Sequence, residues 1–253
     1  MDLLACDFDG TLFCHNTISE ADLCAVKRWR AAGNLFGIVT GRGFMTLQKE
    51  LVRYPLQWDF LLCNNGALML DSAGRTKASR PLEGHLAHEL LTHVMTGECD
   101  SIAVFSDKEM HVLEGFGTWV NPVYRPPFIS REEALQKELI QVSFGFGRRH
   151  KAMSIGESLK KAFDKKAHVQ CSLSVADMTA WGVGKGTGIE WACEVNGWKP
   201  RNILTAGDDG NDVEMLARFE GYAMEGADKT VQSAASGIVE SIAELVALKN
   251  PGC

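Results

Sequence analysis

The 253-residue sequence lacks several features that mark common classes of protein. No run of apolar residues approaches the roughly 20 residues that a transmembrane helix needs. No basic stretch precedes the first apolar residues, so we expect no signal peptide. Basic residues are not in excess, since 26 lysines and arginines face 32 aspartates and glutamates. This balance argues against a nucleic-acid-binding protein.

The cysteines form no recognisable site either. The eight cysteines are scattered, with no C-x-x-C pair and no Cys/His cluster at zinc spacing. We expect free thiols, mostly small core residues, in a protein of the reducing cytoplasm. The chain is long enough for one large domain or two small ones, and its hydrophobic content of 45% supports an ordinary globular core.

Two aspartates follow the first apolar run of the chain. Asp7 and Asp9 come directly after residues 3–6, which predict a buried strand, and Gly10 then allows a sharp turn. The pair could serve as nucleophile and acid/base toward phosphorus, open a calcium loop, or mark a solvated turn. The calcium loop fails because Thr11 and Leu12 stand where that loop needs an acid or amide and then a glycine.

A strand–helix–strand pattern places further polar residues at the same edge. Ser19 predicts a helix N-cap, and residues 35–39 predict a second buried strand, which together favour an α/β fold with a parallel sheet. Ligands collect at the carboxyl ends of such strands. Thr40 and Gly41 follow the second strand and could donate to a phosphate, whereas Arg42 could contact substrate or merely face solvent.

The next strand, over residues 58–63, runs into an Asn-Gly step that predicts a tight turn into a hairpin. Asn65 in this turn could contact substrate or simply form the turn. Both readings are compatible with a hairpin that returns through residues 68–70.

From about residue 81 the pattern changes: a helix followed by two strands occurs twice in succession. We therefore predict an inserted α+β domain over residues 81–181, with a core domain formed by residues 1–80 and 182–253. Its last strand pair is expected at 169–175 and 178–181. Residues 148–151 could form a solvated helix start or bind the anionic tail of a substrate. Trp119 and Arg125 could line a substrate pocket.

Two charged segments follow the insert. Lys185 lies between glycines at a helix start, where it could neutralise an anion or face solvent. Asp208, Asp209 and Asp212 follow a strand at 202–206, and three carboxylates in five residues repel each other without a cation. Such a cluster suits Mg²⁺, although acids are also favoured at any helix N-terminus.

Four segments in this order resemble the motifs of the haloacid dehalogenase-like (HAD) superfamily of phosphotransferases: DFDGTL at 7–12, Thr40, Lys185 and GDDGND at 207–212. The NGA turn at 65–67 resembles its Cof-like sugar-phosphate phosphatases, although Gly226 departs from the asparagine that this branch often has nearby. The resemblance implies a Rossmann-like core whose inserted cap closes over the site and selects the substrate.

The resemblance also implies roles for the residues. Asp7 attacks phosphorus, and Asp9 protonates the leaving oxygen and then deprotonates the attacking water. The phosphate is bound by Thr40, Gly41, Lys185 and Asn211. Mg²⁺ is held by the side chains of Asp7 and Asp208 and by the backbone carbonyl of Asp9, with Asp212 in support.

A metal ion, a lysine and hydrogen-bond donors near Asp7 are needed because Asp7 and the phosphate carry charges of the same sign. A carboxylate about 3 Å from a single phosphate charge is repelled by about 5 kcal/mol at an effective dielectric of 20. The sequence thus predicts a Mg²⁺-dependent phosphatase for a small phosphorylated metabolite such as a sugar phosphate, acting as a cytoplasmic monomer or homodimer. The alternatives are a phosphomutase of the phosphomannomutase type and a non-catalytic metabolite-binding protein on the same scaffold.

Overall fold

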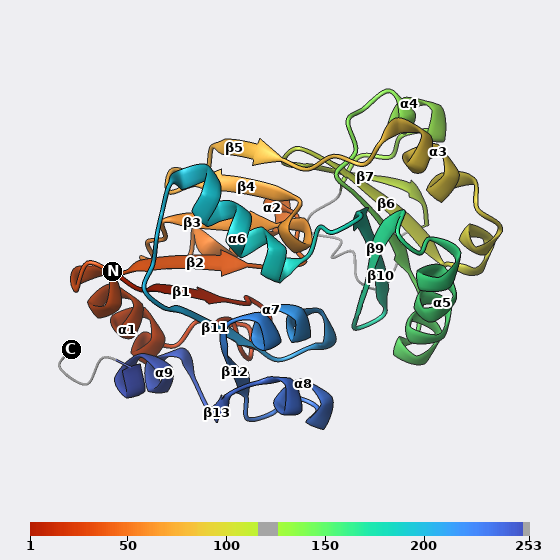
Figure 1. The fold of residues 1–253 in the computed structure, drawn as a ribbon. Helices are drawn as coiled ribbons and strands as arrows, with labels where there is room; N and C mark the ends of the chain where they lie inside the picture. Colours follow the sequence, from red (N-terminus) through yellow and green to blue (C-terminus); the bar gives the residue numbers. More distant parts are fainter. Residues whose placement is uncertain (116–125, 250–253) are drawn as a thin grey trace.

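A computed structural model describes residues 1–115 and 126–249 (Figure 1). These residues form an eight-stranded sheet and a separate five-stranded sheet. Trp119 and Arg125, which could line a substrate pocket, lie outside the described residues. None of the helices in the described ranges is long and apolar enough to cross a membrane.

The eight-stranded sheet has the order β13-β12-β11-β1-β2-β3-β4-β5. Its neighbours from β13 to β3 pair in parallel, and β4 and β5 add an antiparallel edge. The strands are β1 (Leu3–Cys6), β2 (Leu35–Val39), β3 (Phe60–Cys63), β4 (Leu68–Asp71), β5 (Thr76–Ser79), β11 (Ile203–Gly207), β12 (Glu220–Met224) and β13 (Gly237–Val239). The predicted parallel-sheet α/β core is confirmed.

Helices cover both faces of this sheet because its strands are apolar on both sides. On β1, Leu4 and Cys6 pack toward α1, α2 and α9, whereas Leu3 and Ala5 pack toward α6 and α7. The helices are α1 (Glu20–Ala31), α2 (Phe44–Leu51), α6 (Lys185–Asn196), α7 (Val213–Arg218), α8 (Lys229–Ala234) and α9 (Ile242–Lys249). Ser19 caps α1 by accepting a hydrogen bond from the backbone N–H of Asp22, as predicted.

The second sheet is antiparallel, with the order β7-β6-β8-β10-β9. Its strands are β6 (Ser101–Ser106), β7 (Glu109–Glu114), β8 (Gln141–Gly145), β9 (Ala167–Ser172) and β10 (Val175–Ala180). Its helices are α3 (Gly84–Thr92), α4 (Arg131–Leu135) and α5 (Arg149–Ala162). These elements all fall inside the predicted insert, which we call the cap. The limits of the insert at residues 81 and 181 stay a prediction.

The cap sheet has two unlike faces. Alternate residues such as Val142, Phe144 and Met178 pack with α3 and α5 in one apolar cluster. Because side chains alternate along a strand, the residues between them lie on the opposite face, which is turned to the core domain. That face carries polar side chains, among them Gln141, Ser143 and Asp177.

The predicted bounds of the last cap strands are wrong. The turn lies at residues 173–174, where Leu173 has a φ of +50°, and Asp177 sits in the middle of β10. The sequence pattern reads Asp177 as a turn residue because aspartate is rare inside strands. Ser143 and Asn65 satisfy its carboxylate, so the strand accommodates it.

Gly37 on β2 offers a test of core packing. A Cβ at Gly37 would lie 2.2 Å from the Phe60 ring, so Gly37→Ala must displace a buried aromatic side chain. We expect the free energy of unfolding in urea to fall by about 1–3 kcal/mol. Gly84→Ala is the matched control, because nothing lies within 4 Å of its added methyl group. Equal stability of the two variants would contradict this packing.

Candidate active site

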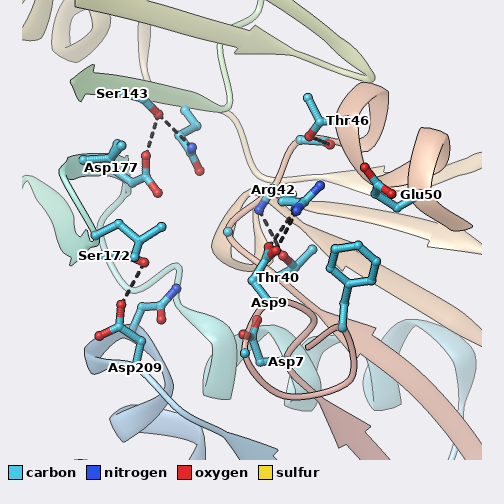
Figure 2. A pocket seen from close by; sticks show the side chains of 18 of the residues that line it. Asp7, Asp9, Thr40, Arg42, Thr46, Glu50, Ser143, Ser172, Asp177 and Asp209 are labelled. Atoms are coloured by element: carbon cyan, nitrogen blue, oxygen red, sulfur yellow. Dashed lines mark hydrogen bonds and ion pairs between the residues drawn. The ribbon is translucent and has the colours of Figure 1, made fainter. Parts of the chain in front are cut away.

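The polar residues of the core domain meet at the carboxyl edge of the parallel sheet. Asp7 follows β1, Thr40 follows β2 and Asp208 follows β11, and these strands are neighbours. A cavity of about 500 Å³ opens there between the core and the cap. Its lining from the core includes Asp7, Asp9, Thr40, Gly41, Arg42, Asp208, Asp209 and Asn211 (Figure 2).

Lys185 is the first residue of α6 and is fully buried. Its Nζ lies 2.6 Å from Asp7 Oδ1 and 2.6 Å from Asp212 Oδ1. Burial alone would lower the pKa of Lys185, but the two carboxylates outweigh it and hold the pKa above its ordinary value. The lysine is therefore a permanent cation beside Asp7, and its alternative as a surface residue does not hold.

Asp212 organises the loop after β11. Its Oδ2 accepts hydrogen bonds from the backbone N–H groups of Asp208, at 2.9 Å, and Asp209, at 3.0 Å. A Cβ at Gly207 would lie 2.4 Å from the Asp212 carboxyl carbon, so only glycine allows this close approach. Asp212 thus fixes both the lysine and the position of Asp208.

Asp208 has the surroundings of a metal ligand. Carboxylate oxygens of Asp7, Asp208 and Asp212 lie within 4.8 Å of one another. Burial raises the pKa of Asp208 to about 6, although Thr11 donates to it at 2.8 Å. Burial likewise raises the pKa of Asp7, opposed by Lys185. Both oxygens of Asp212 are engaged, Oδ1 by Lys185 and Oδ2 by two backbone N–H groups. Asp7 and Asp208 then fit Mg²⁺, which binds few carboxylates and keeps several waters.

Asp9 is held by Arg42 rather than left free. The guanidinium donates through Nε and Nη2 to the two Asp9 oxygens, each at 2.6 Å (Figure 2). It also lies over the Phe8 ring, 5.2 Å from the ring centroid. The sequence left Arg42 between a substrate contact and a solvent-facing side chain. In the structure it fixes the plane of the Asp9 carboxylate while lining the cavity.

Thr40 and Gly41 line the cavity, as does Asn211. Asn211 contacts the turn residue Asn65, donating from Nδ2 to Asn65 Oδ1 at 3.1 Å. Asn65, with a φ of +54°, in turn donates to Asp177 of the cap at 3.0 Å. Asn65 is fully buried and joins the core to the cap, a role that the two sequence readings did not include.

The cap contributes residues that sequence reasoning missed. Gln141, Ser143 and Asp177 line the cavity from the polar face of the cap sheet. Burial raises the pKa of Asp177 to about 6, against the hydrogen bonds from Ser143 and Asn65. The alternation of polar and apolar residues in strands β8 and β10 was the available signal, because a cap sheet needs only one apolar face.

A second contact joins cap and core. Arg149, at the start of α5, lies 3.0 Å from Asp209 Oδ1, and the Ser172 hydroxyl donates to Asp209 Oδ2 at 3.0 Å (Figure 2). Within the basic run at 148–151, Arg149 thus forms an ion pair that joins the cap to the core domain. This contact is neither of the two roles that the sequence suggested for the run.

The comparisons with known proteins agree with this geometry. The sequence profile of the haloacid dehalogenase-like hydrolases matches residues 4–247. The chain belongs to this family. Among curated relatives of the hydrolase, pyridoxal phosphate phosphatase YbhA of Escherichia coli is 26% identical, over 96% of this chain and 97% of the relative. A 5-amino-6-(5-phospho-D-ribitylamino)uracil phosphatase, YcsE of Bacillus subtilis, is 26% identical over 94% and 90%.

Solved structures share the fold of the hydrolase. A HAD/Cof-like hydrolase from Plasmodium vivax has a TM-score of 0.83 at 21% identity, covering 97% of this chain and 94% of its own. A subclass IIB sugar phosphatase has a TM-score of 0.77 at 23% identity, over 100% and 99%. The predictions of a Cof-like superfamily member and of a phosphoric monoester hydrolase are confirmed by the family match and these phosphatase relatives.

Lys185→Met tests the buried ion cluster. The substitution keeps an apolar stem but leaves Asp7 and Asp212 buried without a cation, so we expect the free energy of unfolding to fall by about 3–5 kcal/mol. The control Lys160→Met removes a lysine whose ion pair with Glu157 lies on the surface, which costs about 1 kcal/mol or less. A loss at position 185 no larger than at 160 would refute the role of Lys185.

The raised pKa of Asp177 predicts a pH dependence. From about pH 4 to about pH 6 the folded protein retains a proton that the unfolded chain releases, so this group makes the protein less stable as pH rises through that window. Asp177→Asn should remove this contribution, which urea unfolding across the window measures as a changing difference from wild type. Asp164→Asn, at an exposed turn, is the control. Parallel wild-type and Asp177→Asn curves would contradict the assignment.

Proposed function

We propose that the protein is a Mg²⁺-dependent phosphatase that transfers the phosphoryl group of a small metabolite to Asp7 and then to water. The observation that carries this proposal is the position of Asp7. Its carboxylate lines the cavity and has the buried Lys185 2.6 Å from one oxygen. It also lies in a cluster with Asp208 and Asp212 that fits a divalent cation.

In the first step a carboxylate oxygen of Asp7 attacks phosphorus, and the bond to the leaving oxygen breaks. For this step Asp9 is protonated and released from the ion pair with Arg42; it gives its proton to that oxygen, so the alcohol leaves neutral. In the second step Asp9, now a carboxylate, takes a proton from water, and the resulting hydroxide attacks the same phosphorus. The bond to Asp7 breaks, and inorganic phosphate leaves.

Charge neutralisation and positioning carry most of this chemistry. Lys185 lowers the repulsion between Asp7 and the incoming phosphate, and Thr40, Gly41 and Asn211 are placed to donate to phosphate oxygens. Arg42 holds the Asp9 carboxylate in one plane. Mg²⁺, held by Asp7, Asp208 and the backbone carbonyl of Asp9, would offset further phosphate charge.

We infer the substrate class from the volume of the cavity and from the substrates for which related phosphatases are named. A cavity of about 500 Å³ lies in the range of small-molecule sites. Relatives are named for pyridoxal phosphate and for a phosphoribitylamino-uracil, and a structural neighbour is a sugar phosphatase. These support a small phosphorylated metabolite such as a sugar phosphate. We further propose a cytoplasmic enzyme that acts as a monomer or homodimer.

Phosphate release from p-nitrophenyl phosphate and a sugar-phosphate panel tests the mechanism. We expect Asp7→Asn and removal of Mg²⁺ by chelator to abolish turnover, and Asp9→Asn to lower kcat by about 10²–10⁴-fold, the range for a lost general acid/base. Asp164→Asn, an exposed carboxylate of the cap, should keep wild-type activity.

Three outcomes would contradict this proposal. Turnover that survives Asp7→Asn requires another nucleophile. Phosphate returned to the substrate, with a need for a bisphosphate activator, indicates a mutase. Binding of sugar phosphates with Mg²⁺ but without turnover indicates a binding protein.

A further inference from the structure

Asp177 differs from the other carboxylates of the cavity. Four of them have cationic partners, which are Lys185 for Asp7, Arg42 for Asp9, Arg149 for Asp209 and Arg53 for Glu50, and Asp208 belongs to the proposed metal site. Asp177 lines the same cavity, yet it has no ion-pair partner among residues 1–115 and 126–249. It is also no neighbour of the proposed metal ligands in the sequence. A buried carboxylate without a cation leaves room for a charged or donating ligand group.

The hydrogen bonds around Asp177 all point toward it. Asn211 Nδ2 donates to Asn65 Oδ1 at 3.1 Å, and Asn65 Nδ2 donates to Asp177 Oδ2 at 3.0 Å. Gln141 Nε2 donates to the Ser143 hydroxyl at 2.9 Å, and that hydroxyl donates to Asp177 Oδ1 at 2.5 Å (Figure 2). Both chains end on the carboxylate as acceptor, an arrangement that favours the ionised form of Asp177.

The remaining acceptor positions of Asp177 set a condition on the ligand. A carboxylate offers about four lone-pair positions, and Ser143 and Asn65 use one on each oxygen. What meets the others from the cavity must donate a hydrogen bond. The phosphate cannot do so once Asp7 attacks it. When a substrate displaces water from these positions, the donor that replaces it belongs to the leaving group, as a hydroxyl or an ammonium.

The rest of the wall disfavours a second anion on the substrate. Of the described residues that line the cavity, Arg42 is the sole base, and it is bound to Asp9. Among the described residues of this part of the wall, a second phosphate would face Asp177 with no cation of its own. The cap wall adds apolar surface instead, from Phe105, Met110, Leu173 and Val175.

We propose that Asp177 determines specificity, and that the substrates are monophosphates whose leaving group offers a hydroxyl or ammonium to Asp177 and carries no second phosphate. This inference rests on the proposed phosphatase function. Asp177 selects the leaving group, whereas Asp7 and Asp9 act on the phosphate.

The test compares kcat/KM for two kinds of substrate in each variant. The donor-bearing set is fructose 6-phosphate, glucosamine 6-phosphate and pyridoxal 5′-phosphate, and p-nitrophenyl phosphate is the substrate whose leaving group has no donor. In Asp177→Asn we expect the ratio between the best donor-bearing substrate and p-nitrophenyl phosphate to fall by about 10–100-fold, the range for a lost bond to a charged group. Wild type should use fructose 6-phosphate at least about tenfold better than fructose 1,6-bisphosphate, and Asp177→Asn should narrow that gap.

Two further variants sharpen the test. Glu50→Gln removes a carboxylate of the same cavity that already has Arg53 as its partner, so its ratio should stay within about twofold of wild type. Ser143→Ala keeps the Asp177 charge but removes one donor behind it, and should lower the ratio by a smaller factor of about 3–10. It also serves if Asp177→Asn does not fold by circular dichroism.

The outcomes separate the two proposals. Turnover that depends on Asp7, with an unchanged ratio in Asp177→Asn or equal use of the bisphosphate by wild type, overturns the specificity role alone. Absence of any turnover that depends on Asp7 overturns the phosphatase itself, and the role of Asp177 with it.

Discussion

The buried contact of Lys185 with Asp7 and Asp212 is the interaction on which the rest of the site depends. It joins three charges from both sequence segments of the core, since Asp7 precedes the cap and the other two residues follow it. The cluster is stable only when complete, because any one of these charges left alone in the interior is costly. Its geometry then fixes Asp7, the proposed nucleophile, the start of α6 and, through Asp212, the loop that carries Asp208.

The cap is attached to this cluster by polar contacts rather than by a shared strand. Asn65 links Asn211, in the loop after β11, to Asp177, and Arg149 contacts Asp209 beside the proposed metal ligand Asp208. Polar interfaces of this kind are compatible with relative domain motion, which a lid over a reaction site needs. Three of these contact residues, Asn211, Asp177 and Asp209, also line the cavity, so the contacts between core and cap share side chains with the cavity wall.

Sequence reasoning placed the site residues of the core domain but not those that the cap contributes. Asp7, Thr40, Lys185 and Asp208 could be assigned because each follows a strand or begins a helix in a recognisable motif. Asp177 could not, because its neighbours Asn65 and Ser143 lie 112 and 34 residues away and no local pattern records those bonds. Arg42 had two readings because only the fold brings its guanidinium to Asp9. Local propensity even favoured a turn at Asp177, and the tertiary contacts overrode it.

Transfer of the phosphoryl group to Asp7 is the claim most open to direct measurement. Asp9→Asn should slow hydrolysis of the intermediate, so rapid acid quench of this variant with Mg²⁺ and p-nitrophenyl phosphate, whose leaving group needs no proton from Asp9, followed by peptide mass spectrometry, should find one phosphoryl group on Asp7. The same experiment on the Asp7→Asn, Asp9→Asn double variant should find none. A phosphoryl group on another residue, or wild-type turnover with no phosphorylated enzyme in any quench, would contradict nucleophilic catalysis by Asp7.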